Sequence, residues 1–221
     1  MKRSLLCVAM AICLLFAMST GVFALDFSDV KSNDWFVEDL TDAVDAGIIK
    51  GYEDGTFRPN EMVSRAEMVA MFNRALDIKY SRSISYTDVK AKEWFTNDVE
   101  KAQYAGIVNG YDDGTFRPNN PILRVEAGAL MGRIITKGDY EGYNELQNFK
   151  DFASIGSWAW DDLGLAYRKQ YIQGYPDGAF GPERNLTRAE AITIVMRILK
   201  GEKVVTDAVS FTSNGDALRG T

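Results

Sequence analysis

Apolar residues in this chain form two stripes at helical spacing, separated by a polar stretch rich in glycine. After Trp35, apolar positions recur every three or four residues with acids between them, which predicts an amphipathic helix ending near Gly47. Its stripe is Phe36, Leu40, Ala43 and Val44. A second helix is predicted from Ser64. Its stripe is Met68, Met71, Phe72, Ala75 and Leu76. Between the helices, Asp54-Gly55 predicts a tight hairpin or turn.

This pattern occurs three times, so the chain is an array of repeats. The passage from Gly51 to Pro59 reads Gly-Tyr-Glu-Asp-Gly-Thr-Phe-Arg-Pro, and it returns from Gly110 and, with changes, from Gly174. Each copy therefore reads as helix, hairpin-like loop, helix. One copy cannot bury its apolar faces alone, so we expect a mainly α protein whose three copies pack together with approximate threefold symmetry.

The third copy departs from the others at the end of its first helix. Gln170 stands where the first two copies have Gly47 and Gly106. Glycine is the usual residue just after a helix, because it adopts positive φ without a steric penalty. We therefore expect the third copy to end this helix differently.

The N-terminal segment has the features of a secretory signal peptide. It begins with Met1-Lys2-Arg3, is apolar from Leu5 to Met18, and has small residues before a cleavage site after Ala24. It also contains both cysteines, Cys7 and Cys13, so the mature chain would be free of cysteine and have no membrane span. The expected divisions are 1–24 signal peptide, 25–80 first repeat, 81–143 second repeat, 144–200 third repeat and 201–221 a flexible C-terminal tail, with almost no additional domain.

Composition narrows the possible functions. The 221 residues include no histidine, which removes Ser-His-Asp hydrolysis and histidine-ligated zinc. The formal net charge is −6 and becomes more negative without Lys2 and Arg3, so nucleic acid is not an expected partner. The loop acids lack the spacing of a calcium-binding EF-hand. Because the acids recur in triplicate as turn and cap residues, a glycosidase pair is not expected either. We expect no enzyme, no metal and no cofactor.

An arginine occupies the first position of each second helix. Ser64-Arg65-Ala66-Glu67 and Thr187-Arg188-Ala189-Glu190 contain the reciprocal capping box, while Leu123-Arg124-Val125-Glu126 lacks its hydroxyl but keeps the arginine. A helix N-terminus already favours anions, so free amides together with a guanidinium would suit a carboxylate or phosphate. The alternative is structural pairing of these arginines with Asp29, Asp88 and Asp151.

A tryptophan precedes each first helix, and it also allows two interpretations. Trp35, Trp94 and Trp158 fit a core position, as tryptophans at the start of an amphipathic helix usually do. An exposed indole near an arginine and an aspartate would instead suit an acidic carbohydrate.

Together these motifs closely resemble the surface-layer homology (SLH) repeat. The resemblance rests on Phe27-Ser-Asp-Val30 with Trp35, on Gly51 to Pro59 and on Ser64-Arg-Ala-Glu67, and all three copies match over about residues 26–200. It implies a pseudo-threefold trimer of repeats, with a central bundle of one helix per repeat and grooves between neighbouring repeats. It also implies a bacterial cell-surface location and a secondary cell-wall polysaccharide as ligand, bearing pyruvate ketals.

By position, the resemblance implies specific roles in these grooves. The arginines would bind the ketal carboxylate, the aspartates the sugar hydroxyls, and the tryptophans would form the groove wall; the loop glycines would allow close backbone approach. The implied residues are Arg65, Arg124 and Arg188; Asp29, Asp88 and Asp151; Trp35, Trp94 and Trp158; and Gly51, Gly110 and Gly174.

Two further hypotheses concern function. The groove that uses Arg124 is expected to be the weakest, because its helix motif carries Leu123 and Val125. The leading function is noncovalent anchoring to the cell wall. The alternative is a structural adaptor that binds another surface protein or assists assembly of a surface layer.

Overall fold

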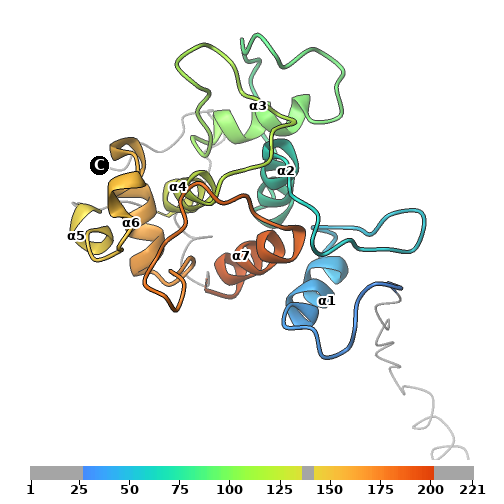
Figure 1. Ribbon diagram of the computed structural model, residues 1–221. Coiled ribbons are helices and arrows are strands. Elements are labelled where there is room, and N and C mark those ends of the chain that lie inside the picture. Colours follow the sequence, from blue (N-terminus) through green and yellow to red (C-terminus); the bar gives the residue numbers. More distant parts are fainter. Residues whose placement is uncertain (1–26, 136–141, 202–221) are drawn as a thin grey trace, which may run out of the picture.

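The structure is a computed structural model that describes residues 27–135 and 142–201 (Figure 1). The expected signal peptide lies outside the described residues, as does the expected tail beyond Gly201. The described part contains seven α-helices, two short 3-10 helices and no strand, which confirms the mainly α prediction. The helices are α1 (Val37–Asp45), α2 (Arg65–Ala75), α3 (Thr96–Tyr104), α4 (Arg124–Ile134), α5 (Tyr143–Leu146), α6 (Trp160–Arg168) and α7 (Arg188–Gly201), with η1 (Phe152–Ser154) and η2 (Ser157–Ala159) before α6.

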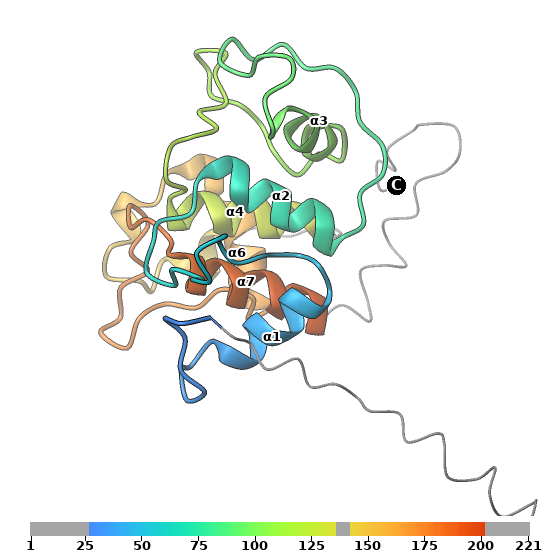
Figure 2. The same cartoon turned by 90° about the vertical axis from the view of Figure 1, so that its right-hand side faces the viewer.

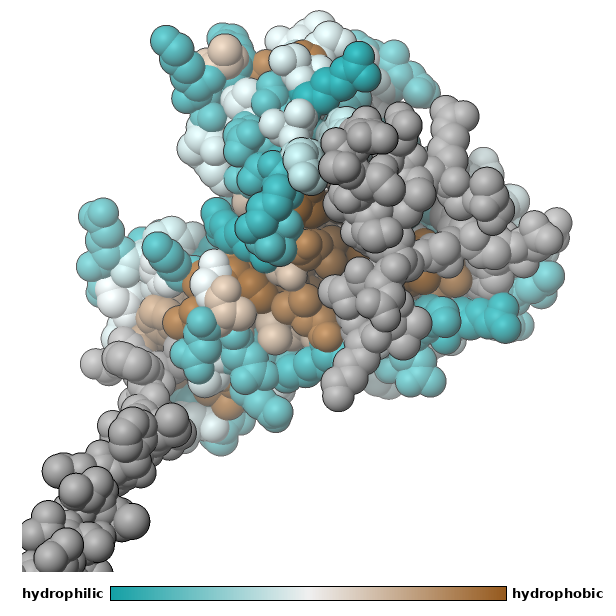
Figure 3. Space-filling view, turned by 180° about the vertical axis from the view of Figure 1, so that it is seen from behind, coloured by the Kyte–Doolittle hydropathy of each residue, from teal (hydrophilic) through white to brown (hydrophobic). Residues whose placement is uncertain are grey.

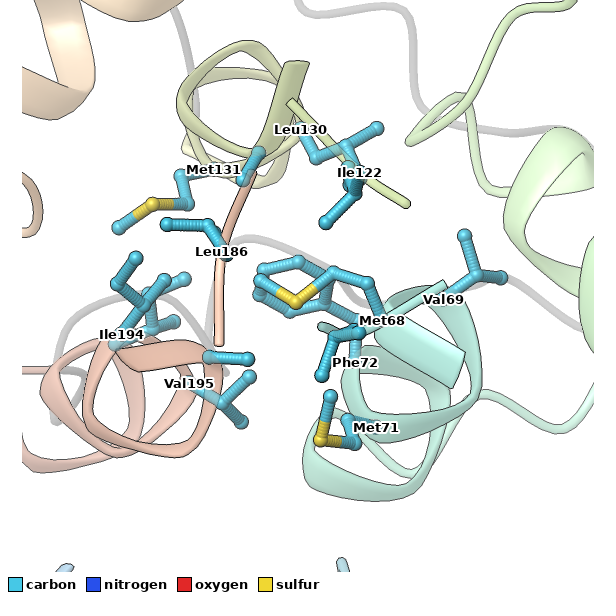
Figure 4. Close-up of a cluster of buried hydrophobic side chains, with 14 of the residues drawn as sticks. Met68, Val69, Met71, Phe72, Ile122, Leu130, Met131, Leu186, Ile194 and Val195 are labelled. Atoms are coloured by element: carbon cyan, nitrogen blue, oxygen red, sulfur yellow. The ribbon is translucent and has the colours of Figure 1, made fainter. Parts of the chain in front are cut away.

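The second helix of each copy lies at the centre of the molecule. Helices α2, α4 and α7 surround a cluster of buried apolar side chains that point toward one another, including Phe72, Met131 and Val195 (Figure 4). The first helices lie outside this centre (Figures 1 and 2). Each of them packs on the central helix of the copy before it: α3 on α2, α6 on α4, and α1 on α7. The copies are therefore linked in a cycle, and none has a core of its own.

A ring of backbone hydrogen bonds joins the three copies just before their central helices. The Val63 amide donates to the Leu186 carbonyl (2.9 Å), Leu186 donates to Ile122 (3.2 Å), and Ile122 donates back to Val63 (2.9 Å). All three residues are fully buried. Buried amides and carbonyls need partners, and here each copy satisfies its neighbour.

The starts of the central helices are held in the same cyclic way. In α2, the amides of Arg65 and Ala66 donate to the carbonyls of Asn120 and Pro118, at 2.9 and 3.0 Å. The first two amides of α4 donate likewise to Arg184 and Pro182, and those of α7 to Glu61 and Pro59. An α-helix leaves its first amides without internal partners. In this protein the loop of the next copy supplies the acceptors.

The loop between the two helices contains a tight turn, as its Asp-Gly pair predicts. The Gly55 amide donates to the Tyr52 carbonyl (3.0 Å), and Gly55 has φ +78°. The Asp54 carboxylate accepts hydrogen bonds from the backbone and hydroxyl of Thr56, at 3.0 and 2.6 Å. These bonds, with that from Arg58, lower the pKa of Asp54 to about 2.

The prediction that the third copy ends its first helix differently, at Gln170, is wrong. Gln170 adopts φ +63°, close to the +69° of Gly47 and the +72° of Gly106. The Tyr171 amide then donates to the Ala166 carbonyl (3.1 Å), as the equivalent residues do in the other two copies. The packing of the whole copy therefore imposes the left-handed conformation on a residue that disfavours it.

The first loop glycine of each copy is required by packing. A Cβ on Gly51 would lie 2.1 Å from the Phe27 ring, and one on Gly110 would lie 2.2 Å from Tyr86. Gly174 has the same relation to Phe149, at 2.3 Å. The aromatic residue that opens each copy therefore rests directly on the loop backbone.

We predict that Gly51→Ala destabilises the protein, because the new methyl group displaces the Phe27 ring. Overpacking of this kind typically costs about 1–3 kcal/mol, which urea unfolding would measure. Phe27→Leu in the same chain should recover part of the loss, because it removes the atoms that clash. Equal unfolding free energies for Gly51→Ala and wild type would contradict this packing role.

Candidate functional site

The three motif arginines lie between copies. Each is the first residue of a central helix, and Arg65, Arg124 and Arg188 are only 6%, 8% and 6% exposed. Each side chain reaches into the loop of the next copy in the cycle. The Arg188 Nε donates to the Phe57 carbonyl (2.8 Å), that of Arg65 to Phe116 (2.9 Å) and that of Arg124 to Phe180 (3.0 Å). The guanidinium groups are thus fixed in place before any ligand binds.

A tyrosine supports each guanidinium from the same loop. The guanidinium carbon of Arg188 lies 4.8 Å from the centroid of the Tyr52 ring, and Arg65 and Arg124 lie 4.8 Å from Tyr111 and Tyr175. Cations at this distance are attracted to the ring face. The sequence interpretation assigned no role to these tyrosines. Their signal was present, because tyrosine follows the loop glycine in all three copies.

A glutamate approaches two of the guanidinium groups, but unequally. The Arg65 Nη1 lies 3.0 Å from Glu126 Oε1, whereas the Arg188 Nη1 lies 3.8 Å from Glu67 Oε1. The Glu126 side chain is 9% exposed and that of Glu67 is 35% exposed. Among the described residues, no acid forms an ion pair with Arg124. The positive charge of Arg65 is therefore the best compensated.

The same glutamates also cap the helices that they open. The Ser64 amide donates to Glu67 Oε2 (2.8 Å) while the Glu67 amide donates to the Ser64 hydroxyl (3.2 Å), and Thr187 with Glu190 repeats this capping box. In the second copy, only the bond from the Leu123 amide to Glu126 is possible (2.9 Å). Since neighbouring carbonyls occupy the first two amides of every central helix, the expectation of free helix amides is wrong. The first two amides of each central helix are therefore not open to an anion.

Each motif aspartate holds the loop of its own copy. The Asp29 carboxylate accepts from the amides of Phe57 (2.8 Å) and Arg58 (2.7 Å), one on each oxygen. Asp88 accepts likewise from Phe116 and Arg117, and Asp151 from Phe180 and Gly181. The ion pairs of the described residues do not include the alternative Asp–Arg pairs. The arginines do link the copies, but through carbonyls and glutamates.

The motif tryptophans are not core residues. Trp35 is 65% exposed, and Trp94 and Trp158 are each 57% exposed. The interpretation that placed them in the core is therefore wrong. The aromatic residue that follows Trp35 and Trp94, Phe36 or Phe95, is buried instead.

Two cavities bring an arginine and a tryptophan together, and we name them after the tryptophan. The Trp94 groove has a volume of about 500 Å³ and the Trp158 groove about 620 Å³. The Trp94 groove is lined by residues that include Lys50, Glu67, Arg74, Trp94 and Arg188. The Trp158 groove is lined by residues that include Arg65, Tyr111, Asp112, Arg117, Glu126, Arg133 and Trp158. Each groove takes its loop from one copy, its motif arginine from the copy before and its tryptophan from the copy after.

Two of the expected loop glycines line different cavities. Gly110 lines the Trp158 groove, whereas Gly174 lines a cavity of about 660 Å³ formed within the third copy alone. Seen from behind, hydrophilic residues cover much of the outer lobes, and hydrophobic residues gather in the recess between them (Figure 3).

Burial changes the titration of two groups in these sites. It raises the pKa of Tyr111 to about 12, helped by the hydrogen bond that its hydroxyl donates to Glu126. Burial also lowers the pKa of Arg124, and nearby Arg184 and Arg197 act in the same direction. The desolvation that accompanies burial of Arg124 thus outweighs the opposing effect of Tyr175 and Glu190.

Comparison with known proteins identifies the repeats. The model of the S-layer homology domain matches residues 26–69, 85–127 and 148–192. An amylopullulanase of Thermoanaerobacterium thermosulfurigenes is 35% identical over 79% of this chain, which is 9% of that enzyme. A cellulosome-anchoring protein of Acetivibrio thermocellus is 31% identical over 70% of this chain and 36% of its own length. A surface-layer 125 kDa protein of Lysinibacillus sphaericus is 27% identical over 79% of this chain and 15% of its own. In each case the match spans far less than two thirds of the relative.

We predict that Tyr111 contributes to stability up to high pH. Its pKa in the fold is above the ordinary value of 10.0, so its contribution is complete below pH 10 and is lost as the pH rises toward 12. Between these values, Tyr111→Phe should therefore lose less stability than wild type, as measured by urea unfolding at each pH.

The matched control is Tyr143→Phe, which removes a phenol that is 43% exposed. Tyrosinate absorbance should also show one fewer high-pH step in Tyr111→Phe. Identical pH profiles for wild type and Tyr111→Phe would overturn the assignment.

Proposed function

This chain belongs to the S-layer homology family, and on that premise we propose that it is a non-catalytic module that anchors to the bacterial cell wall. Its ligand is a secondary cell-wall polysaccharide bearing pyruvate ketals, bound noncovalently in the grooves between repeats. The relatives support the anchoring role, since they include a cellulosome-anchoring protein and a surface-layer protein. The enzymes among them share only a small part of their length with this chain.

One observation carries the choice of ligand: Arg188 and Trp94 line the same cavity. A guanidinium presents paired N–H donors that match a carboxylate, and an exposed indole offers an apolar surface to a sugar ring. A sugar that carries a pyruvate ketal has both a carboxylate and a ring face. The Trp158 groove repeats the combination with Arg65.

The structure also supports preorganised binding. Carbonyl groups and a tyrosine ring orient each guanidinium, so little conformational entropy remains to be lost on binding. The carbonyls of Phe57 and Lys50, for example, accept from Arg188 Nε and Nη2, which leaves the hydrogens of Nη1 to meet a ligand.

We retain the site residues expected from the sequence as part of this proposal. Arg65, Arg124 and Arg188 bind carboxylates. The tryptophans form groove walls, and Asp29, Asp88 and Asp151 reach sugar hydroxyls with the lone pairs that the loop amides leave unused. Gly51, Gly110 and Gly174 keep the loop backbone accessible. Because the aspartates and glycines also hold the loops, their substitution would act through the fold as well.

Polysaccharide recognition is tested by binding residues 25–221 to purified cell-wall sacculi, before and after mild acid treatment that removes ketal-linked pyruvate. We expect acid treatment to abolish binding. Arg188→Ala should weaken binding to untreated sacculi by about tenfold to a hundredfold, the usual effect of losing hydrogen bonds to a charged group.

Two further variants separate binding from folding. Trp94→Ala changes an exposed residue and should weaken binding without changing the unfolding midpoint. Arg82→Ala removes an exposed arginine outside both grooves and should bind normally. Undiminished binding to acid-treated wall would argue for peptidoglycan, and no binding to either preparation would favour the adaptor that binds another surface protein.

We further predict that Arg124→Ala weakens polymer binding less than Arg65→Ala or Arg188→Ala. Arg124 is not among the residues that line the Trp94 and Trp158 grooves, whereas Arg188 and Arg65 are, and the burial of Arg124 disfavours its charged form. Parallel affinity measurements on the three variants give the order. A loss in Arg124→Ala that equals or exceeds the other two would refute it.

A further inference from the structure

Three equivalent aspartates are held by three different donors. Asp39, Asp98 and Asp162 occupy the same position in the first helix of successive copies, 59 and 64 residues apart. Asp39 accepts from Lys200 Nζ (2.7 Å), Asp98 Oδ1 from Asn73 Nδ2 (3.0 Å), and Asp162 Oδ2 from Arg133 Nε (2.9 Å). Each donor comes from the central helix that packs on that first helix.

This difference leaves one of two equivalent arginines in an ion pair and the other outside one. Arg133 forms an ion pair with Asp162, which is buried. Arg74 is the equivalent residue, 59 positions before Arg133. The carboxylate that Arg74 would otherwise contact, Asp98, accepts a hydrogen bond from Asn73 instead. Arg74 is exposed, and its Nη1 donates to the Ile48 carbonyl (3.0 Å). Within the described residues, Arg74 forms no ion pair.

A second cation faces the same groove. Lys50 is exposed and lines the Trp94 groove with Arg74. Its equivalent in the Trp158 groove is Asn109, which is uncharged. Lys50, like Arg74, forms no ion pair with the acids of the described part of the chain.

The two grooves therefore differ in net charge. The Trp94 groove has three cations, Lys50, Arg74 and Arg188, against the single acid Glu67. The Trp158 groove is also lined by three cations, but by two acids, Asp112 and Glu126, and each of its cations forms an ion pair: Arg65 with Glu126, Arg133 with Asp162 and Arg117 with Asp113. Of the two grooves, the Trp94 groove therefore has the larger excess of positive charge among its lining residues.

We propose that Lys50 and Arg74 form a second anion subsite in the Trp94 groove. It takes a second acidic group of the polymer, a carboxylate or a phosphate, in addition to the ketal carboxylate assigned to Arg188. The Trp158 groove takes a unit with a single negative charge. This inference rests on the proposed function, because it places the second acid on the same polysaccharide.

The subsite should add selectivity for charge while contributing little to the total affinity. Both side chains are exposed, so each interaction with an anion is worth little and is weakened by salt. Two such contacts nevertheless add to the buried Arg188 contact. The expected signature is a preference for doubly charged ligands that disappears at high salt.

The test uses two variants of residues 25–221 that each weaken one groove, Trp158→Ala and Trp94→Ala. The probes are a methyl hexoside with one pyruvate ketal, and the same sugar with an added carboxylate or an added phosphate. In Trp158→Ala, the doubly charged probes should bind about fivefold more tightly than the singly charged probe at low salt, as expected for two exposed contacts. In Trp94→Ala, the probes should bind alike.

Further substitutions in each of these two variants identify the residues that form the second anion subsite. In Trp158→Ala, Lys50→Gln with Arg74→Gln should abolish the preference and leave binding of the singly charged probe within about twofold, since the exposed side-chain charges contribute little to a contact that they do not themselves make. In Trp94→Ala, Asn109→Lys should create a preference. All three substitutions are at exposed positions, and equal unfolding midpoints would confirm that folding is intact.

The outcomes separate this inference from the proposed function. If Trp158→Ala binds the singly charged sugar but shows no preference, or keeps its preference without Lys50 and Arg74, the second subsite is wrong and the anchoring proposal stands. If neither the wild-type protein nor any of the variants binds the singly charged sugar, the polysaccharide proposal itself fails.

Discussion

The closed ring of backbone hydrogen bonds between Val63, Ile122 and Leu186 is the constraint on which the rest of the structure depends. It fixes where each central helix begins, and the next two amides of each helix extend the same linkage to the neighbouring loop. Since these groups are buried, breaking one bond would leave polar atoms without water or a partner. The copies can therefore satisfy their backbones only as a set of three.

This linkage explains why the motif arginine serves two purposes. Its position as the first helical residue places it against the loop of the next copy, where Arg188 donates to the Phe57 and Lys50 carbonyls. These bonds compensate part of the cost of burying a guanidinium. They also orient its remaining donors toward the groove. Stability and ligand geometry thus depend on the same side chain, so variants at exposed Trp94 report on binding more cleanly.

The repeats preserve contacts while exchanging the residues that make them. Arg58 pairs with Asp54 in the first copy, but Gly181 replaces that arginine in the third, and Lys150 pairs with Asp177 instead. Arg184 lies over Tyr175 (4.4 Å), as Arg58 does over Tyr52 (3.8 Å). Where such exchanges alter charge next to a cavity, as at Lys50 and Arg74, they make similar folds unequal in what they can bind.

Local signals in the sequence determined the mainly α fold, the two helices of each copy, the Asp-Gly turns and the capping boxes, because apolar periodicity and cap chemistry act over a few residues. They also identified the arginines and tryptophans that meet in the grooves. The sequence could not show that Trp94 and Arg188 share a cavity, that neighbouring loops occupy the helix amides, or that Gln170 takes a glycine conformation. Only the tertiary structure decided these features, because each depends on contacts that the cyclic packing makes between residues far apart in the chain.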